Sequence, residues 1–396
     1  MEEWKNGRMD APPQSSNLPI FGRVRLRNGM NDHEKYSPWL HRFAVLVVVV
    51  TFLVIISGGN VTSRGAGLSV PDGFTVFGHF LWTFPMERWV GNIFHEHIHR
   101  LKGSIIGVLI IVLAFWLLLS QRRPWLRLVG LATLGLVLIQ GILGAWRVDR
   151  ISTTYAIIHG IHAQIILCMT VWIAAATSRY WGQRVGAAGG AGCVAGDVAG
   201  NVEEYSVTLR RVSILLLAAL GVQLVLGALV RHHGASLAIP DFPAHYGGFF
   251  PPFTDSGIEA AHDAIVSYDQ TTSAQYPTPF QVAVHFSHRI WALPVVAIVI
   301  WLITCVAGRA PSDPALLRPS MALACLLIAQ VTLGVCVVTS GRLGHFATAH
   351  QATGAAILGT AALLMIRLHA LRPLHADGVA PHPASTVNSP LERHTA

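Results

Sequence analysis

Long, nearly uninterrupted runs of apolar residues dominate the chain and predict its elements. Eight runs are long enough as helices to cross a bilayer core of about 30 Å. They lie near residues 39–58, 99–119, 126–145, 155–177, 209–230, 284–307, 320–339 and 346–368. A run such as FAVLVVVVTFLVIISGG is apolar on every face, and a buried soluble helix does not explain eight of them in succession. The sequence therefore predicts an all-α integral membrane protein with eight transmembrane helices.

Composition and charge agree with this class. Of 396 residues, 52% are hydrophobic and 12% are charged, about half the charged fraction of a typical soluble domain. The net charge of +8 raises the question of a nucleic-acid partner. Most of the 28 Lys and Arg residues, however, fall in the segments on the same side as the two chain ends. Because basic residues favour the cytoplasmic side, we expect a bacterial inner-membrane protein with both termini in the cytoplasm and no nucleic-acid partner.

The two halves of the chain repeat. The segment SRGAGLSVPD (63–72) returns 169 positions later as HHGASLAIPD (232–241). Each copy follows an odd-numbered span and precedes a long outer loop, which ends in HEHIHR (95–100) or HFSHR (285–289). This pattern predicts two duplicated four-helix bundles.

The repeat also divides the chain into regions. The prediction is an N-terminal cytoplasmic tail, a first bundle, a cytoplasmic linker, a second bundle and a C-terminal cytoplasmic tail. In that order they cover residues 1–38, 39–177, 178–208, 209–371 and 372–396.

Four histidines carry the candidate chemistry: His99, His159, His288 and His350, each near the outer start of an even-numbered predicted span. An ionisable side chain inside a bilayer is costly and marks a functional site. Two histidines per half, on different helices at similar depth, suit a planar cofactor with two axial ligands. Imidazoles on opposite faces of a heme give six-coordinate iron. A histidine that only bonds water or backbone is a fair alternative for any single position. For a duplicated set of four, we predict metal ligands.

Glu96 precedes His99 by three residues, so both lie on one face of a helix. Its predicted role is catalytic: a carboxylate over the first-half cofactor that handles protons or an oxidised carbon. The alternative is a first-turn glutamate that complements the helix dipole. The second half has His285 at the corresponding place. The two sites are therefore chemically unequal, which allows one catalytic half and one electron reservoir.

Arg100 and Arg289 directly follow the histidines and are predicted to bind heme propionates, since arginine grips carboxylates with paired hydrogen bonds. Asp72 and Asp241, in the glycine-rich repeats, are expected to stabilise tight turns rather than act in catalysis. The chain has no CxxCH, which excludes covalent c-type heme, and no HExxH, which disfavours a zinc protease.

Together these motifs resemble the heme A synthase family over about residues 40–370. The resemblance is carried by VTSRGAGLSVPD, WVGNIFHEHIHRLKGSIIG, TTYAIIHGIHAQ, VRHHGASLAIPDFP with PFQVAVHFSHR, and AHQATGA. The family oxidises a methyl group of heme O to a formyl group, giving heme A for terminal oxidases. The implied partners are heme O, membrane lipid, a heme O synthase and oxidase assembly proteins, with the electron donor or acceptor left open.

The resemblance also implies residue roles. Glu96 and His99 match the family's glutamate and histidine of the second helix. His159 matches the fourth-helix histidine, with His162, one turn later, as an open substitute. His288 and His350 match the second-half pair, which implies a resident heme b there. The first half would then bind heme O and its product heme A.

Two departures and two alternatives accompany this interpretation. The outer loops lack the cysteine pairs of some members, and Gly73 stands where an aromatic residue often follows the first Pro-Asp. One alternative is a non-catalytic bis-His membrane cytochrome b in a quinol-linked electron-transfer chain. The other, a transporter with inverted repeats, is disfavoured because four spans per half give parallel repeats.

Overall fold

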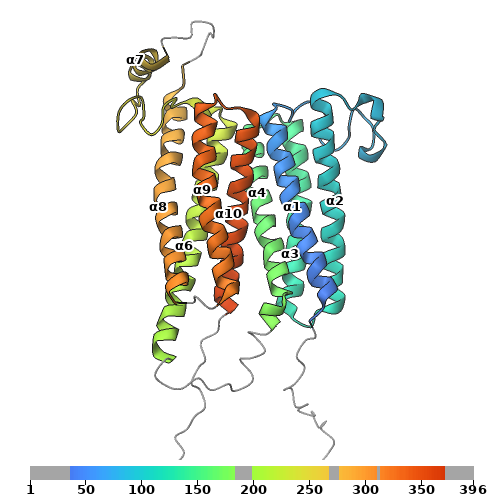
Figure 1. Cartoon of the computed structure of the whole chain (residues 1–396). Helices are drawn as coiled ribbons and strands as arrows, with labels where there is room; N and C mark the ends of the chain where they lie inside the picture. The colour runs from blue at the N-terminus through green and yellow to red at the C-terminus, as the bar shows by residue number, and fades with distance from the viewer. Residues whose placement is uncertain (1–35, 183–198, 267–275, 310–312, 371–396) are drawn as a thin grey trace, which may run out of the picture. The chain divides into compact units, whose positions relative to one another are not determined.

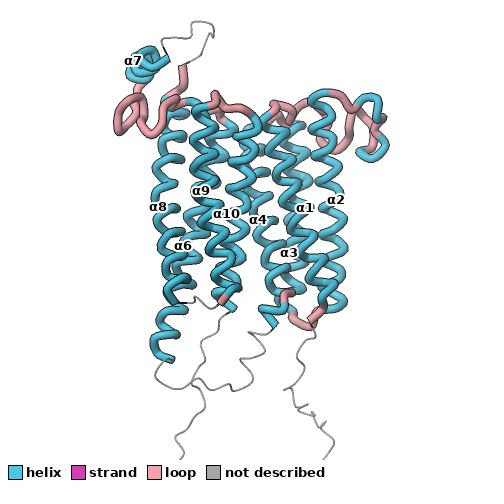
Figure 2. Tube along the Cα trace, in the orientation of Figure 1, coloured by secondary structure: helices cyan, strands magenta, loops and turns pink. Residues whose placement is uncertain are grey.

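The computed structural model describes residues 36–182, 199–266, 276–309 and 313–370, which are mostly helical (Figures 1 and 2). Eight of its helices are long and apolar enough to cross a membrane, confirming the predicted class. They are α1 (Pro38–Ser63), α2 (Gly91–Ser120), α3 (Pro124–Asp149), α4 (Thr153–Ala176), α6 (Ala199–His232), α8 (Pro279–Arg309), α9 (Pro314–Thr339) and α10 (Gly344–Ala370). The predicted tails up to residue 35 and from residue 371, and the linker at 183–198, lie outside the described residues.

Large apolar side chains point outward from these helices as well as inward. Leu119, Leu128 and Ile328 are 85%, 66% and 70% exposed. Apolar surface on this scale is not stable in water, whereas lipid hydrocarbon solvates it. The exposed leucines and isoleucines therefore mark the lipid-facing surface.

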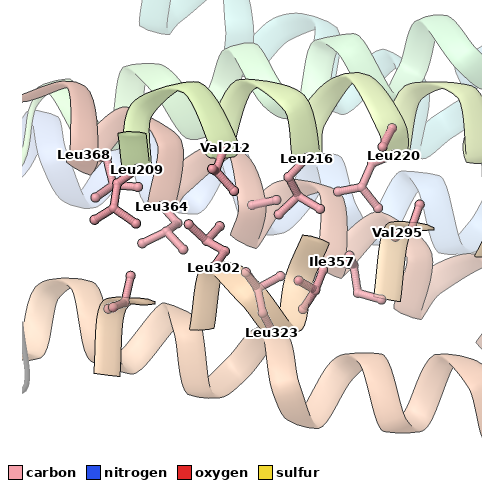
Figure 3. Packing of buried hydrophobic residues seen from close by; sticks show 14 of the residues in the cluster. Leu209, Val212, Leu216, Leu220, Val295, Leu302, Leu323, Ile357, Leu364 and Leu368 are labelled. Carbon is pink, nitrogen blue, oxygen red and sulfur yellow. The ribbon is translucent and has the colours of Figure 1, made fainter. Parts of the chain in front are cut away.

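Helix packing closes a ring of four helices in each half. In the first half α1 contacts α2 and α4, and α3 contacts α2 and α4; in the second, α8 joins α6 to α9, and α10 contacts both α6 and α9. Separate apolar cores fill the two rings, and Figure 3 shows the second, where Leu216 and Leu302 meet Leu364. A third cluster joins α1, α4 and α10, the helices that meet between the halves. The duplication and the domain boundaries stay predictions.

Two spans begin earlier than their hydropathy predicts. Helix α2 starts at Gly91 rather than near residue 99, and α8 starts at Pro279 rather than near residue 284. The polar segments HEHIHR and HFSHR lower the local hydropathy, but their side chains bind the outer loops, so the helix continues through them. His99 is consequently the ninth residue of α2 and lies inside the helix rather than at its start.

The two outer loops contain corresponding turns. Phe77–Gly78 and, 169 positions later, Tyr246–Gly247 both adopt left-handed backbone conformations, with φ of 48°, 76°, 58° and 74°. Asp72 accepts the backbone N–H of Gly78 at 2.7 Å, and Asp241 accepts those of Tyr246 and Gly247, both at 2.8 Å. The predicted role of these two aspartates as turn residues is confirmed.

The second loop also carries a helix that the sequence analysis did not predict, α7 (Asp255–Val266). Its Ile258 is fully buried in an apolar cluster with Ile239 and Val282. With 12 residues, α7 is shorter than the roughly 20 residues of a membrane-crossing helix, which is the length that the hydropathy analysis selects.

The Asp241 turn generates a pH prediction. Burial alone raises the pKa of Asp241, but hydrogen bonds from Gly247 and Tyr246, together with the charge of Arg289, lower it overall. A carboxylate with a lowered folded-state pKa stabilises the fold above its unfolded pKa, and this contribution disappears as the pH falls through the folded value. We expect Asp241→Ala to open the turn at neutral pH, whereas the wild type opens it only in acid below the ordinary aspartate range.

Chymotrypsin cleavage near the exposed Phe249 measures this opening. Glu259→Ala, which removes an exposed carboxylate from α7, is the matched control. Equal cleavage of the Asp241 variant and the control would contradict the prediction.

Candidate functional site

Each of the four predicted ligand histidines packs against a glycine of a neighbouring helix in its own half. The pairs are Gly58 with His99, Gly144 with His159, Gly227 with His288, and Gly334 with His350. A Cβ atom at these glycines would meet Cε1 of the facing ring at 3.0, 3.2, 3.1 and 3.1 Å, closer than ordinary van der Waals contact. These four, here called the seating glycines, let each imidazole lie directly on a helix backbone.

Three of the four seating glycines follow a glutamine by four residues. The segments are QGILG (140–144), QLVLG (223–227) and QVTLG (330–334), whereas the first helix has VIISG (54–58). Residues four apart share one face of a helix, so the amide and the glycine meet the same ring. The sequence analysis missed these residues, although the recurring Q-x-x-L-G pattern was visible.

The second-half pair has the geometry of two axial ligands. The ring centroids of His288 and His350 are 6.4 Å apart. Nδ1 of His350 donates to the backbone carbonyl of Gln330 at 3.1 Å, and its Nε2 accepts from the Gln330 amide at 3.2 Å. Nε2 therefore carries the lone pair that a metal requires. The Gln223 amide donates to the carbonyl oxygen of His288 at 3.1 Å and lies 3.2 Å from its Nδ1.

The distance between these two rings matches that of two imidazoles bound to one iron. Iron–imidazole bonds of about 2 Å on each face, with each ring centre about 1 Å behind its nitrogen, put the two centroids about 6 Å apart. The spacing of His288 and His350 agrees with this value. The backbone partner of His350 is also the usual orienting bond of a metal-bound histidine.

In the first half the structure favours His159 over His162 as the fourth-helix ligand. His159 lies on Gly144 and within electrostatic range of His99. His162 instead donates to Oε1 of Gln140 at 2.7 Å, and the amide of Gln140 donates to the His159 carbonyl at 3.2 Å. His162 thereby orients a residue that contacts the ligand. Nδ1 of His99 is buried and has no hydrogen-bond partner within the described ranges.

Glu96 is buried, at 3% exposure, and anchors the first repeated loop. Its Oε2 accepts the backbone N–H groups of Ser69 and Val70 at 2.8 and 3.0 Å. Its Oε1 accepts from Arg100 at 2.7 Å. These bonds use both oxygens to fix the loop beside the His99 helix.

His285 anchors the second loop in the same way. Its Nδ1 accepts the backbone N–H of Ile239 at 3.2 Å, and its Nε2 lies 3.2 Å from Nε of Arg289. Ile239 corresponds to Val70 in the repeat, 169 positions earlier. Glu96 and His285 thus bond the same backbone position of their loops and lie beside the arginine four residues later, and they are here called the loop anchors.

The two arginines predicted to bind propionates donate hydrogen bonds to backbone carbonyl groups of the outer loops. Arg100 donates to Asp72 O at 2.6 Å, and Arg289 donates to Asp241 O at 2.8 Å. Each arginine therefore ties its loop to the helix that carries a ligand histidine. A propionate contact for either one stays a prediction.

Two further arginines lie near the ligand histidines: Arg147, which the sequence analysis did not consider, and Arg231, for which the sequence allows either a propionate contact or an interfacial position at lipid head groups. The side chain of Arg147 lies against Gly67 of the first loop, within electrostatic range of His99, and makes no hydrogen bond to any residue in the described part of the chain. Arg231 donates to Gly59 O at 2.6 Å and to Ser63 Oγ at 2.7 Å, which connects α6 to α1. Both place positive charge near the ligand histidines.

These features define an eight-span membrane protein in which each half carries a pair of histidines between helices, under an anchored outer loop. A model of the COX15-CtaA family of cytochrome oxidase assembly proteins matches residues 41–362, and the chain belongs to this family.

Known relatives cover most of the chain. It is 28% identical to a heme A synthase of Beijerinckia indica over 365 residues, 82% of this chain and 90% of that protein. It is 26% identical to a heme A synthase of Methylorubrum extorquens, over 92% of this chain and 90% of the relative. It is 29% identical to a heme A synthase of Rhodospirillum centenum, over 73% and 70%.

The loop anchor Glu96 is testable. Glu96→Ala leaves a buried arginine and two backbone N–H groups without their acceptor, and we expect a loss of about 3–5 kcal/mol in unfolding free energy. Glu96→Gln keeps one acceptor oxygen and should lose less. Hydrogen–deuterium exchange of the peptide covering residues 66–73 should rise sharply in the alanine variant.

Glu87→Ala, an exposed glutamate in the same outer loop, is the control and should leave this exchange unchanged. Protection of residues 66–73 that survives in Glu96→Ala would show that Glu96 is not the anchor.

Proposed function

We propose that this chain is a heme A synthase, which oxidises a methyl group of heme O to a formyl group. The observation that carries the proposal is the His288–His350 pair, spaced at 6.4 Å for an iron porphyrin. The family membership and the names of the relatives give the reaction. A bound iron porphyrin supplies the redox chemistry, while the residues of the chain bind, orient and enclose it.

We further propose that the second half holds a resident heme b and the first half exchanges heme O for heme A. In the second half Nδ1 of His350 donates to the backbone carbonyl of Gln330, an acceptor that raises ligand basicity and metal affinity. In the first half Nδ1 of His99 lacks such an acceptor among the described residues. The first pocket therefore binds its heme less firmly. Weaker binding suits a substrate that must leave as product.

Other side chains support binding in this proposal. Arg147 and Arg231 offer buried positive charge for carboxylate groups of a porphyrin. Glu96, with Arg100, keeps the first loop over the pocket and excludes water. The sequence makes a further prediction for Glu96, that its carboxylate transfers protons during the oxidation.

The membrane setting follows the same proposal. We place both termini in the cytoplasm of a bacterium and the outer loops on the opposite face of the inner membrane, since basic residues gather on the side of the chain ends. Heme O then reaches the first pocket from within the bilayer, from a heme O synthase, and heme A passes on to oxidase assembly.

The proposed reaction is tested by expressing the chain with a source of heme O and separating the extracted hemes by chromatography. We expect heme A or its hydroxylated precursor from the wild type. His99→Ala should lose product but keep the resident heme, and His288→Ala should lose the resident heme. A folded, heme-loaded wild type that yields neither product would contradict the synthase proposal and agree with the cytochrome b alternative.

The seating glycines generate a sharper prediction with a matched control. Gly227→Ala places a methyl group about where the His288 ring lies and should weaken heme retention in the second half at least tenfold. Gly221→Ala, six residues earlier in α6, meets nothing within 4 Å and shares the gain in helix propensity. The heme absorption spectrum of the purified protein, measured against protein concentration, compares the two. Equal heme content in the two variants would contradict the role of Gly227.

A further inference from the structure

A groove of about 920 Å³ runs along α1, where α1 faces α2 on one side and α10 on the other. It lies outside both histidine pairs, and none of the four ligand histidines lines it. Leu53 and Ile105 in its wall are 51% and 42% exposed, so the groove opens toward lipid. It is therefore a candidate site for a molecule that reaches the protein from the bilayer.

The chemistry of the lining changes in order along the groove. Two cations line the groove: Arg64 lies at the outer end of α1, and Lys102 lies on α2 three residues beyond His99, which packs against Gly58 of α1. Below Arg64, α1 presents the amide of Asn60 and the hydroxyl of Ser57. Deeper still, the α1 wall is apolar and ends at Val50. A cationic, then polar, then apolar wall matches the order of phosphate, ester and acyl chain in a phospholipid.

The wall formed by α10 covers the outer part of the groove. Thr348 shares a hydrogen bond with Ser63 of α1, and Gln351 lies against Gly59, so Ala349 and Ala352 lie beside the polar part of the α1 wall. Their small side chains leave width between the two helices.

Length and charge agree with such an occupant. From Arg64 to Val50, α1 rises about 21 Å at 1.5 Å per residue. Half of a bilayer, headgroups included, is about 20–22 Å thick. The described lining contains Arg64 and Lys102 but neither Asp nor Glu, so the groove attracts an anion.

We propose that this groove binds one anionic phospholipid from the leaflet on the side of the outer loops. The phosphate lies between Arg64 and Lys102, and one acyl chain lies along Leu53. Arg64 is oriented for this contact by Asn60, whose Oδ1 accepts from Arg64 Nε at 3.1 Å.

The site lies where the two halves meet. Directly behind its polar part, Ser63 of α1 and Thr348 of α10 share a hydrogen bond of 2.8 Å, and Arg231 of α6 donates to Ser63. A lipid that spans the wall from α1 to α10 covers this contact and stabilises the pairing of the halves. The proposal is independent of the heme reaction, because none of the residues that line the groove is a proposed heme ligand or a loop anchor.

Native mass spectrometry of the purified, delipidated full chain tests the site. The probes are phosphatidylglycerol and phosphatidylcholine with identical acyl chains. We expect one phosphatidylglycerol to bind in preference to phosphatidylcholine and to raise the midpoint of thermal unfolding. Replacing each cation, in Arg64→Gln and Lys102→Gln, should weaken phosphatidylglycerol binding roughly fivefold, and the double variant should lose both the preference and the thermal shift.

Arg88→Gln, an exposed outer-loop cation outside the groove, is the matched control and should behave as the wild type. Ala352→Phe fills the groove beside Gly59 and should exclude both lipids from the site. Equal binding of the two lipids by the wild type, or an unchanged preference in the double variant, would overturn the proposal. An equal loss in Arg88→Gln would also overturn it, because general surface charge would then explain the preference. Heme content and product formation, measured on the same variants, should not change.

Discussion

Placing imidazole rings between apolar helices is the constraint on which the rest of the structure depends. A ring nitrogen removed from water is costly unless it finds a hydrogen-bond partner or a metal. In this chain a second helix packs against each histidine and provides both space for the imidazole ring and a polar group near it. Space comes from the seating glycines, where a methyl group would stand 3.0–3.2 Å from a ring atom. The polar group comes from a glutamine one turn away, in three of the four cases. Each glycine therefore fixes the register of a helix pair.

The outer loops depend on the same helices. Each loop anchor precedes a ligand histidine by three residues, Glu96 before His99 and His285 before His288. Residues three apart lie on neighbouring positions of one helix face. Any rotation of α2 or α8 that moves the ligand also moves the anchor and pulls on the loop. The position of the ligand histidine is therefore coupled to the position of the outer loop. This coupling explains why these helices continue through polar sequence beyond their apolar spans.

The sequence predicts the eight spans and the ligand histidines, because apolar length and intramembrane ionisable groups are strong one-dimensional signals. It places the starts of α2 and α8 too late, because hydropathy does not record that polar side chains find partners in a loop. The seating glycine Gly58, which lacks the glutamine pattern, cannot be recognised from the sequence for a different reason. A glycine in an apolar run has no distinctive period, and its meaning depends on which ring the neighbouring helix brings to it. Arg147 is equally ambiguous, since an arginine at the end of a span is usually interfacial.

Two differences between the halves act in the same direction. The first loop is anchored by the carboxylate of Glu96, whose negative charge offsets that of Arg100. The second is anchored by His285, which leaves the charge of Arg289 without a partner carboxylate at the anchor itself. A porphyrin carrying carboxylates is therefore attracted less by the anchor of the first pocket than by that of the second. The first pocket also binds iron more weakly, because Nδ1 of His99 has no hydrogen-bond partner among the described residues. Under the proposed function, these two features, one electrostatic and one in the ligand shell, favour exchange in the first half and retention in the second.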